Sequence, residues 1–253
     1  MNTIWRSGIL CLALASGMAY AEPRTRIEIV TESSPPSSML EFGRVTGFAT
    51  DKLRVVMERS GIDHTITLLP WKRALLMAQT QPNTCVYSTT RTPEREALFK
   101  WVGPTHENDW TLFGLAKRNF KLTTLEDARG LRIGAYNGDV RGDALTARGF
   151  EVDSVQDRVS NPRKLLVGRI DLWASGMRMG TSIVAENGWS GQIVPVLTFQ
   201  RTELYLACNR GVPDRLVAKM NAALQAIKRE GIAAAIERKY FPSAVAAMPV
   251  RNP

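Results

Sequence analysis

Short apolar runs alternate along the chain with stretches in which apolar residues recur every three or four positions. Such runs are typical of buried strands, and the wider spacing is typical of amphipathic helices. The runs predict strands at residues 26–30, 66–69, 85–88, 110–115, 131–135, 151–155, 170–174, 193–196 and 203–208. The alternation favours an α/β fold built from βα units on a mainly parallel sheet.

Capping residues and prolines predict where the helices begin and end. We expect Thr50 or Asp51 to cap a helix that ends at Gly61, and a second helix at residues 71–79. Thr92 followed by Pro93 is typical of the start of another short helix. Two helices are predicted at the end of the sequence, one with apolar residues at 216, 220, 224 and 227 and one with them at 232, 236 and 240.

The first 21 residues have the features of a cleaved signal peptide. Arg6 provides the positive charge, residues 9–18 form an apolar stretch, and Ala19-Tyr20-Ala21 matches the small-residue cleavage pattern. No later stretch reaches the roughly 18 continuous apolar residues of a membrane span. We therefore expect a soluble mature chain that begins near Glu22 and is exported to the periplasm.

The chain is basic, with 33 Lys and Arg against 24 Asp and Glu and a formal net charge of +9. An exported basic protein attracts anionic ligands, membrane surfaces or cell-wall polymers. However, no block of five like charges occurs, and the arginines are spread along the whole chain. We expect a solvated basic surface and no nucleic-acid partner.

Cysteines and histidines are too few to suggest a metal site. Cys11 falls in the predicted signal peptide, which leaves Cys85 and Cys208, and the histidines are His64 and His106. No CxxC pair or zinc-type spacing occurs, so we expect no metal and no cofactor. A disulfide is compatible with an oxidising compartment, but we expect two buried free thiols because the two cysteines lie far apart in sequence.

Several motifs, taken in order, resemble the family 3 extracellular solute-binding proteins, which include the polar amino-acid binding proteins of ABC importers. The motifs are Thr31-Glu32-Ser33-Ser34-Pro35-Pro36, Gly47-Phe48-Ala49-Thr50-Asp51, Pro70-Trp71-Lys72-Arg73, Ser88-Thr89-Thr90-Arg91-Thr92-Pro93-Glu94-Arg95, Arg132-Ile133-Gly134-Ala135 and Gly168-Arg169-Ile170-Asp171. The resemblance covers essentially the whole mature chain.

This resemblance implies a type II periplasmic-binding-protein fold, in which two α/β lobes joined by two hinge crossings hold a ligand in the cleft between them. Lobe one is expected to comprise residues 22–108 and 202–253, and lobe two residues 109–201. The crossings are expected near residues 108–111 and 200–203. Hinge closure around the ligand is the expected motion.

The resemblance also implies roles for individual residues. Arg95 matches the arginine that binds the ligand carboxylate, Thr90 matches a hydroxyl residue that bonds the same group, and Ser88 lies where a strand end contacts the ligand. Trp71 falls near an apolar position that packs on the ligand. Asp139 falls in the loop that opens a lobe-two helix, where other members offer backbone N–H groups.

Two departures from the family pattern concern the ligand's amine. Binders of α-amino acids usually have an aspartate, which accepts the α-ammonium, five residues after the aspartate that corresponds to Asp171; here that position is Gly176. Ser34 replaces a frequent aromatic residue. Both departures put a conventional α-amino acid in question unless Glu32 or Asp139 accepts the ammonium.

Physical arguments that are independent of the resemblance also bear on whether these residues bind a ligand. Arg95 lies in a first helical turn, where the helix dipole disfavours a cation, so an anion shared with the turn's free N–H groups would explain it. The alternative is that Arg95 turns outward to Glu94, Glu96 or water. Glu32 either accepts a ligand ammonium or caps nearby N–H groups, and Asp139 is either a ligand residue or a helix cap.

Three other residues near the expected cleft are weaker candidates for ligand binding. Trp173 is expected in the core of lobe two. His106 is expected to be a satisfied structural residue. Arg141 is a weaker candidate for a second anion contact.

Three functions are compatible with this pattern. The first is a non-catalytic binding protein that delivers a small anionic or zwitterionic solute to an ABC transporter permease and acts as a monomer. The second is a dehydratase-type enzyme on the same scaffold, for which only Glu32, Asp139 and His106 are acid or base candidates. The third is a ligand-sensing partner of a membrane receptor. We expect the first, because the sequence has no nucleophile motif or metal-ligand set.

Overall fold

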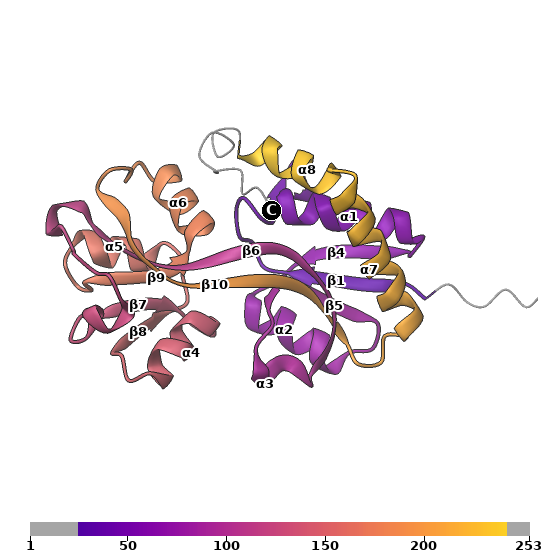
Figure 1. Cartoon of the computed structure of the whole chain (residues 1–253), viewed down its shortest axis with the longest axis horizontal. Helices are drawn as coiled ribbons and strands as arrows, with labels where there is room; N and C mark the ends of the chain where they lie inside the picture. Colours follow the sequence, from indigo (N-terminus) through magenta and orange to yellow (C-terminus); the bar gives the residue numbers. More distant parts are fainter. Residues whose placement is uncertain (1–24, 242–253) are drawn as a thin grey trace, which may run out of the picture.

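The computed structural model describes residues 25–241, which form two α/β lobes side by side (Figure 1). Two long antiparallel strands, β6 (Phe99–Leu115) and β10 (Ile193–Asn209), run from one lobe to the other. They join the strands of both lobes into one eight-stranded sheet of order β4-β1-β5-β10-β6-β9-β7-β8. The expected fold class, a type II periplasmic-binding-protein fold, is confirmed.

Lobe one is built on β1 (Ile27–Thr31), which pairs in parallel with β4 (His64–Leu68) and β5 (Thr84–Thr90). Helices α1 (Phe48–Ser60), α7 (Asp214–Arg229) and α8 (Ile232–Tyr240) cover one face, while α2 (Trp71–Thr80) and α3 (Pro93–Glu96) lie on the other (Figure 1). A small hairpin, β2 (Met39–Glu41) and β3 (Arg44–Thr46), precedes α1.

Lobe two is built on β7 (Ile133–Tyr136), which pairs in parallel with β8 (Val152–Val155) and β9 (Leu172–Gly176). Helix α4 (Val140–Ala147) packs on one face, and α5 (Ser160–Leu166) and α6 (Met177–Glu186) pack on the other. Two short 3₁₀ turns, Ala116–Arg118 and Leu125–Ala128, connect β6 to β7.

Each lobe has its own hydrophobic core. In lobe one, Val56 and Met57 of α1 pack with strand β1 and with Met220 of α7. In lobe two, Trp173 is 3% exposed and its ring centroid lies 5.2 Å from that of Phe113, which agrees with its expected place in the core. Separate cores allow the two lobes to move as units about the strands that connect them.

The two long strands replace shorter predicted elements. Residues 193–196 and 203–208 belong to the single strand β10, and Gly103-Pro104, expected to close a block, lies inside β6. The antiparallel pairing continues through register shifts, which carry each strand past its irregular residues. Asn108 pairs with Thr202 between the lobes, and the Thr202 hydroxyl donates to the Asn108 carbonyl at 2.7 Å. The lobe boundaries near these residues stay a prediction.

The start of α1 differs from the expected cap at Thr50 or Asp51. The helix begins at Phe48 with Gly47 as N-cap, where φ is 118° and ψ is 157°. A Cβ on Gly47 would lie 2.3 Å from the Ser37 carbonyl oxygen, so the glycine allows the preceding loop to pack against the helix start. Thr50 is instead buried inside the helix, where its hydroxyl lies 2.7 Å from the Tyr87 hydroxyl.

The expectation of two free thiols is wrong, because Cys85 and Cys208 form a disulfide. Strands β5 and β10 are antiparallel neighbours, and their register places Cys208 directly opposite Cys85. Both cysteines are fully buried. A sequence separation of 123 residues gave no sign of this pairing, since it depends on the return of the chain into lobe one.

The predicted signal peptide, residues 1–21, lies outside the described residues. Across residues 25–241 we find no helix with the length and apolar character needed to cross a membrane.

Candidate functional site

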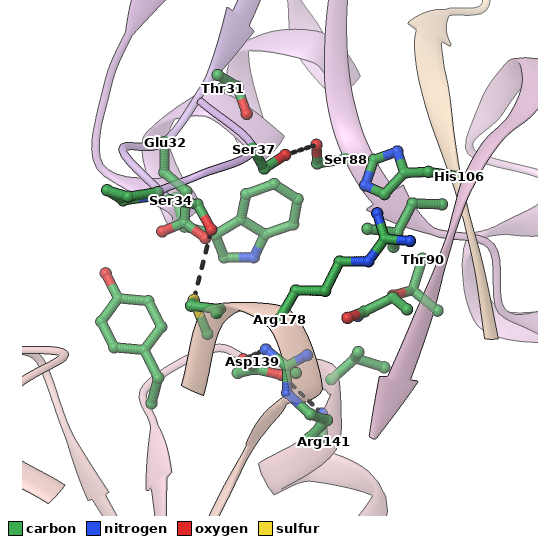
Figure 2. A pocket seen from close by; sticks show the side chains of 18 of the residues that line it. Thr31, Glu32, Ser34, Ser37, Ser88, Thr90, His106, Asp139, Arg141 and Arg178 are labelled. Atoms are coloured by element: carbon green, nitrogen blue, oxygen red, sulfur yellow. Dashed lines mark hydrogen bonds and ion pairs between the residues drawn. The ribbon is translucent and has the colours of Figure 1, made fainter. Parts of the chain in front are cut away.

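A cavity of about 90 Å³ lies between the lobes. All six residues predicted to bind the ligand line it: Glu32, Trp71, Ser88, Thr90 and Arg95 from lobe one, and Asp139 from lobe two. Figure 2 shows their surroundings, with side chains of both lobes pointing into the same space. That these residues bind a ligand remains a proposal, but the fold brings them together.

The lobe-one wall comes from the carboxyl ends of two parallel strands. Strand β1 ends at Thr31, just before Glu32, and its neighbour β5 ends at Thr90. Carboxyl ends of parallel strands meet at one edge of a sheet, where open α/β folds hold their ligands. The Ser88 hydroxyl lies 3.2 Å from that of Ser37 in the loop after β1 (Figure 2). Two hydroxyl residues, Ser88 and Thr90, thus stand at this edge.

Arg95 extends into the cavity from the first turn of α3. Its Nη1 donates to the Thr90 carbonyl at 3.4 Å, and no carboxylate of residues 25–241 lies within ion-pair distance. Burial lowers the pKa of Arg95, while the negative charges of Asp139, Asp143 and Glu94 oppose this change. The alternative contact with Glu94 or Glu96 is therefore not formed, and Arg95 is a partly buried cation without a carboxylate partner.

Asp139 both lines the cavity and caps a helix. Its side chain accepts from the backbone N–H of Arg141 at 2.9 Å at the start of α4, and it forms an ion pair with the Arg141 guanidinium. The two interpretations of Asp139 are thus compatible, because the same residue caps α4 and lines the cavity. Arg141 itself is 8% exposed and also lines the cavity.

Glu32 forms an ion pair with Arg158, which comes from lobe two. The Arg158 guanidinium also lies 4.9 Å from the centre of the Tyr136 ring. Burial raises the pKa of Glu32 above 4.5, although the positive charge of Arg158 opposes this effect. Glu32 is therefore engaged across the cleft, and it does not cap a helix.

Trp71 packs in the core of lobe one and also lines the cavity. Its side chain is 8% exposed and packs with Val30, Ala74 and Val86 on one face of the lobe-one sheet. It also reaches the cavity wall. Ser34, which stands where an aromatic residue is frequent, donates its hydroxyl to the sulfur of Met179 in lobe two at 3.4 Å (Figure 2).

Arg178 is a cavity residue that the sequence analysis missed. It stands in the first turn of α6, and its side chain extends into the cavity (Figure 2). Its guanidinium lies 5.2 Å from the centre of the Phe48 ring and 3.4 Å from Glu237, both in lobe one. The argument that singled out Arg95, a cation in a first helical turn, applies equally to Arg178. That signal was available, but only the structure shows that α6 faces the cleft.

His106 lines the cavity and has a clear structural role. Its ring packs edge-on against Phe48 at 4.9 Å, and its Nδ1 lies 3.0 Å from the Thr105 hydroxyl. Because that hydroxyl donates to the Leu204 carbonyl, Nδ1 is assigned as the protonated nitrogen. Burial lowers the pKa of His106 well below 6.5, and the charges of Lys52 and Arg178 act in the same direction. The imidazole is therefore neutral near pH 7.

Gly176 ends β9 and lies at the cavity wall. A Cβ at this position would lie 2.5 Å from the Asn108 amide oxygen and 3.3 Å from Nη1 of Arg141. The space that a side chain would take is thus filled by these two groups. Within the described residues, no cluster of three or more His, Cys, Asp or Glu side chains is arranged to hold a metal ion.

The family model and the curated relatives that match this chain all describe solute-binding proteins. The model of the family 3 bacterial extracellular solute-binding proteins matches residues 27–243. Among proteins of Escherichia coli (strain K12), the chain is 27% identical over 245 residues to ABC transporter arginine-binding protein 1. It is 25% identical over 256 residues to the putative ABC transporter arginine-binding protein 2. Each alignment covers 92% of this chain and 98% of the relative.

Solved structures share the fold. A histidine kinase sensor domain with similarity to periplasmic binding proteins superposes with a TM-score of 0.77, at 19% identity, covering 85% of this chain and 95% of that one. The arginine-, lysine-, histidine-binding protein ArtJ of Geobacillus stearothermophilus gives 0.75, at 19% identity, covering 86% and 96%. An ancestral amino acid-binding protein, a precursor of cyclohexadienyl dehydratase, gives 0.72, at 19% identity, covering 86% and 96%.

The family match spans nearly all of the described residues, and the two lobes, the two connecting strands and the cavity between them are those of a solute-binding protein. The chain belongs to the family 3 bacterial extracellular solute-binding proteins.

Proposed function

We propose that this protein is the periplasmic substrate-binding protein of an ABC importer, and that it captures a small carboxylate-bearing solute by closure of its two lobes. The observation that carries the proposal is the environment of Arg95, a partly buried guanidinium that faces the cavity and has no carboxylate partner within residues 25–241. A buried charge without a partner is unfavourable, so a ligand anion would complete the site.

The groups around Arg95 suit a carboxylate. A guanidinium presents two parallel N–H donors that match the two oxygens of a carboxylate. Ser88 and Thr90 bring hydroxyl groups to the same edge of the lobe-one sheet. Under this proposal Arg95 binds the carboxylate, Thr90 and Ser88 bond its oxygens, and Trp71 forms an apolar wall.

Contacts between the lobes support closure as the mode of capture. Glu32 pairs with Arg158, and Ser34 bonds Met179, in each case across the cleft. Within residues 25–241 the chain passes from one lobe to the other in the paired strands β6 and β10, near Asn108 and Thr202. We place the hinge there, with residues 22–108 and 202–253 as lobe one and residues 109–201 as lobe two.

The cellular setting of the proposal follows from the family and its relatives. Two curated relatives are ABC transporter arginine-binding proteins, so we propose that this chain delivers its solute to the membrane permease of such a transporter. Export would use residues 1–21 as a cleaved signal peptide and place the mature monomer in the periplasm.

The state of the acid and base candidates supports binding over catalysis. Glu32 and Asp139 are each held in an ion pair with an arginine, and His106 is neutral with its Nδ1 bonded to Thr105. A general acid or base needs a proton-transfer group free to reach the substrate. We therefore propose that the protein is not an enzyme.

A thermal-shift screen of the refolded mature chain tests the proposal, because refolding removes ligand that was carried through purification. The panel comprises amino acids, amines, monocarboxylates and dicarboxylates. A ligand at 100 times its dissociation constant stabilises a protein by about 2.7 kcal/mol. We expect the stabilising compounds to carry a carboxylate. Stabilisation by amines alone, or by no carboxylate in the panel, would contradict the proposal.

A further inference from the structure

Arg141 is a deeply buried cation whose hydrogen-bonding groups are incompletely used. It is 8% exposed and lines the cavity from the first turn of α4. Among residues 25–241 its guanidinium bonds only Asp139, and its Nε is buried without a partner. A guanidinium has five N–H donors, so several are left for another acceptor. Because Arg141 lines the cavity, an acceptor held there would lie beside its side chain.

Gly176 leaves room for this guanidinium beside a second polar group. A Cβ on Gly176 would lie 3.3 Å from Nη1 of Arg141 and 2.5 Å from the side-chain oxygen of Asn108. Asn108 also lines the cavity, and its amide has donors as well as an acceptor. The cavity wall at Gly176 is thus formed by the end groups of Arg141 and Asn108.

The charges around the cavity disfavour a ligand ammonium. Three arginines line the cavity, Arg95, Arg141 and Arg178. The carboxylate of Asp139 is taken by Arg141, since one oxygen accepts from the backbone N–H and the other from the guanidinium. The carboxylate of Glu32 is taken by Arg158. The third acidic lining residue, Glu107, is exposed to solvent.

Arg141 is better suited than Arg178 to hold a second anion. The guanidinium of Arg178 lies over the rings of Phe48 and Phe241, at 5.2 and 4.7 Å, and within 3.4 Å of Glu237. Glu237 in turn accepts from Lys52 at 2.7 Å. Arg178 therefore has several partners in lobe one, whereas the Nε of Arg141 has none.

We propose that Arg141, supported by Asn108 and by the space at Gly176, binds a second carboxylate of the ligand, so that the preferred solute is a small dicarboxylate without an ammonium group. This inference rests on the proposed function, in which Arg95 binds the first carboxylate. Because Arg95 belongs to lobe one and Arg141 to lobe two, the ligand connects the lobes through its two ends. The second carboxylate thereby favours the closed state.

Matched ligands isolate the second carboxylate. Glutarate and its monoamide differ only in whether one end is an anion, and succinate with its monoamide repeats the comparison at a shorter length. We expect calorimetry to show at least one dicarboxylate bound about tenfold or more tightly than its monoamide, since hydrogen bonds to charged groups are the stronger class. L-arginine, named for the relatives, is expected to bind more weakly than that dicarboxylate.

Two variants test whether the difference in affinity between dicarboxylate and monoamide depends on Arg141. In Arg141→Gln the ratio between dicarboxylate and monoamide should fall to about one, whereas Arg132→Gln should keep it. Arg132 is a matched control, because it pairs with Asp171 in the same lobe and does not line the cavity. If Arg141→Gln unfolds because Asp139 loses its partner, the double variant Asp139→Asn with Arg141→Gln removes the pair together and should show the same loss.

The outcomes separate this inference from the proposed function. Tighter binding of a monoamide or of L-arginine than of either dicarboxylate would overturn the second-carboxylate assignment while leaving the function of Arg95 intact. A dicarboxylate preference unchanged in Arg141→Gln, or in the double variant, would also overturn it. The second-carboxylate assignment would also be overturned if neither dicarboxylate binds at millimolar concentration.

Discussion

Arg158 of lobe two reaches across the cleft to form an ion pair with Glu32 of lobe one. The side chains are 18% and 21% exposed, so the pair is shielded from solvent on most sides. The guanidinium also stacks over Tyr136 of its own lobe at 4.9 Å. Arg158 therefore links the two lobes from a position outside the set of residues that line the cavity, and under the proposed closure it would stabilise the closed state.

Arg158→Gln should weaken ligand binding, although Arg158 does not line the cavity. The closed state loses a charged hydrogen bond worth about 1.5–3 kcal/mol, which corresponds to about tenfold or more in the dissociation constant. Calorimetry with any ligand found by the screen measures the change. Arg163→Gln, an exposed arginine of α5, is the matched control and should bind as the unmodified protein does. Equal affinities of the two variants would contradict a role for Arg158 in closure.

Glu32 should give the stability a specific dependence on pH. Burial raises the pKa of Glu32 above its ordinary value of 4.5, against the opposing charge of Arg158. Asp139, Arg141 and Tyr136 also face this group. Because the folded state then holds the proton more tightly than the unfolded chain, the contribution of Glu32 is largest below pH 4.5 and declines as the pH rises through the raised pKa.

Denaturant unfolding of the unmodified protein and of Glu32→Gln on both sides of pH 4.5 tests this dependence. Glutamine does not titrate, so the stability of the unmodified protein relative to the variant should fall with rising pH. Parallel curves, or a relative rise, would show that the carboxylate form is not disfavoured in the folded state.

The disulfide should contribute substantially to stability. It joins Cys85 and Cys208 across 123 residues and so restricts the unfolded chain. The double variant Cys85→Ala with Cys208→Ala should lose about 2–4 kcal/mol of unfolding free energy. Thiol titration of the denatured mature chain provides the check on the bond itself. We expect no reactive thiol, and two reactive thiols would contradict the disulfide between Cys85 and Cys208.

Gly176→Ala should impair the site more than the fold. The added methyl group would lie 2.5 Å from the Asn108 amide oxygen and 3.3 Å from Nη1 of Arg141, so both side chains must move. We expect at least a tenfold loss of affinity, or about 1.4 kcal/mol. Gly211→Ala, outside the cavity, is the control, because its nearest contact is a side-chain atom at 3.1 Å. Equal binding by both variants would show that Asn108 and Arg141 adapt freely.

Local sequence signals predicted much of the fold, and the resemblance to a known family indicated six of the residues that line the cavity. Strand periodicity located β1, β5 and β7, and Thr92 with Pro93 located α3, because these features depend on neighbouring residues. The order of motifs then indicated which loops meet. Features that depend on distant segments were missed.

The missed features share one cause, which is contact with segments outside the local sequence pattern. The disulfide arises from the register of β5 against β10, and the length of β6 arises from its antiparallel pairing with β10. Arg178 and Arg158 became visible only when lobe two was placed against lobe one. Glycine as the N-cap of α1 depends on the close approach of Ser37, ten residues earlier.

Calorimetric titration of Arg95→Ala with a carboxylate ligand from the screen tests the central claim most directly. Arg91→Ala is the matched control, because Arg91 lies just before α3, pairs with Glu96 and does not line the cavity. Removing one partner of a buried charged pair costs about 3–5 kcal/mol, so Arg95→Ala should weaken binding at least about a hundredfold and Arg91→Ala should not. An unchanged dissociation constant in Arg95→Ala would contradict the proposal that Arg95 holds the ligand's carboxylate.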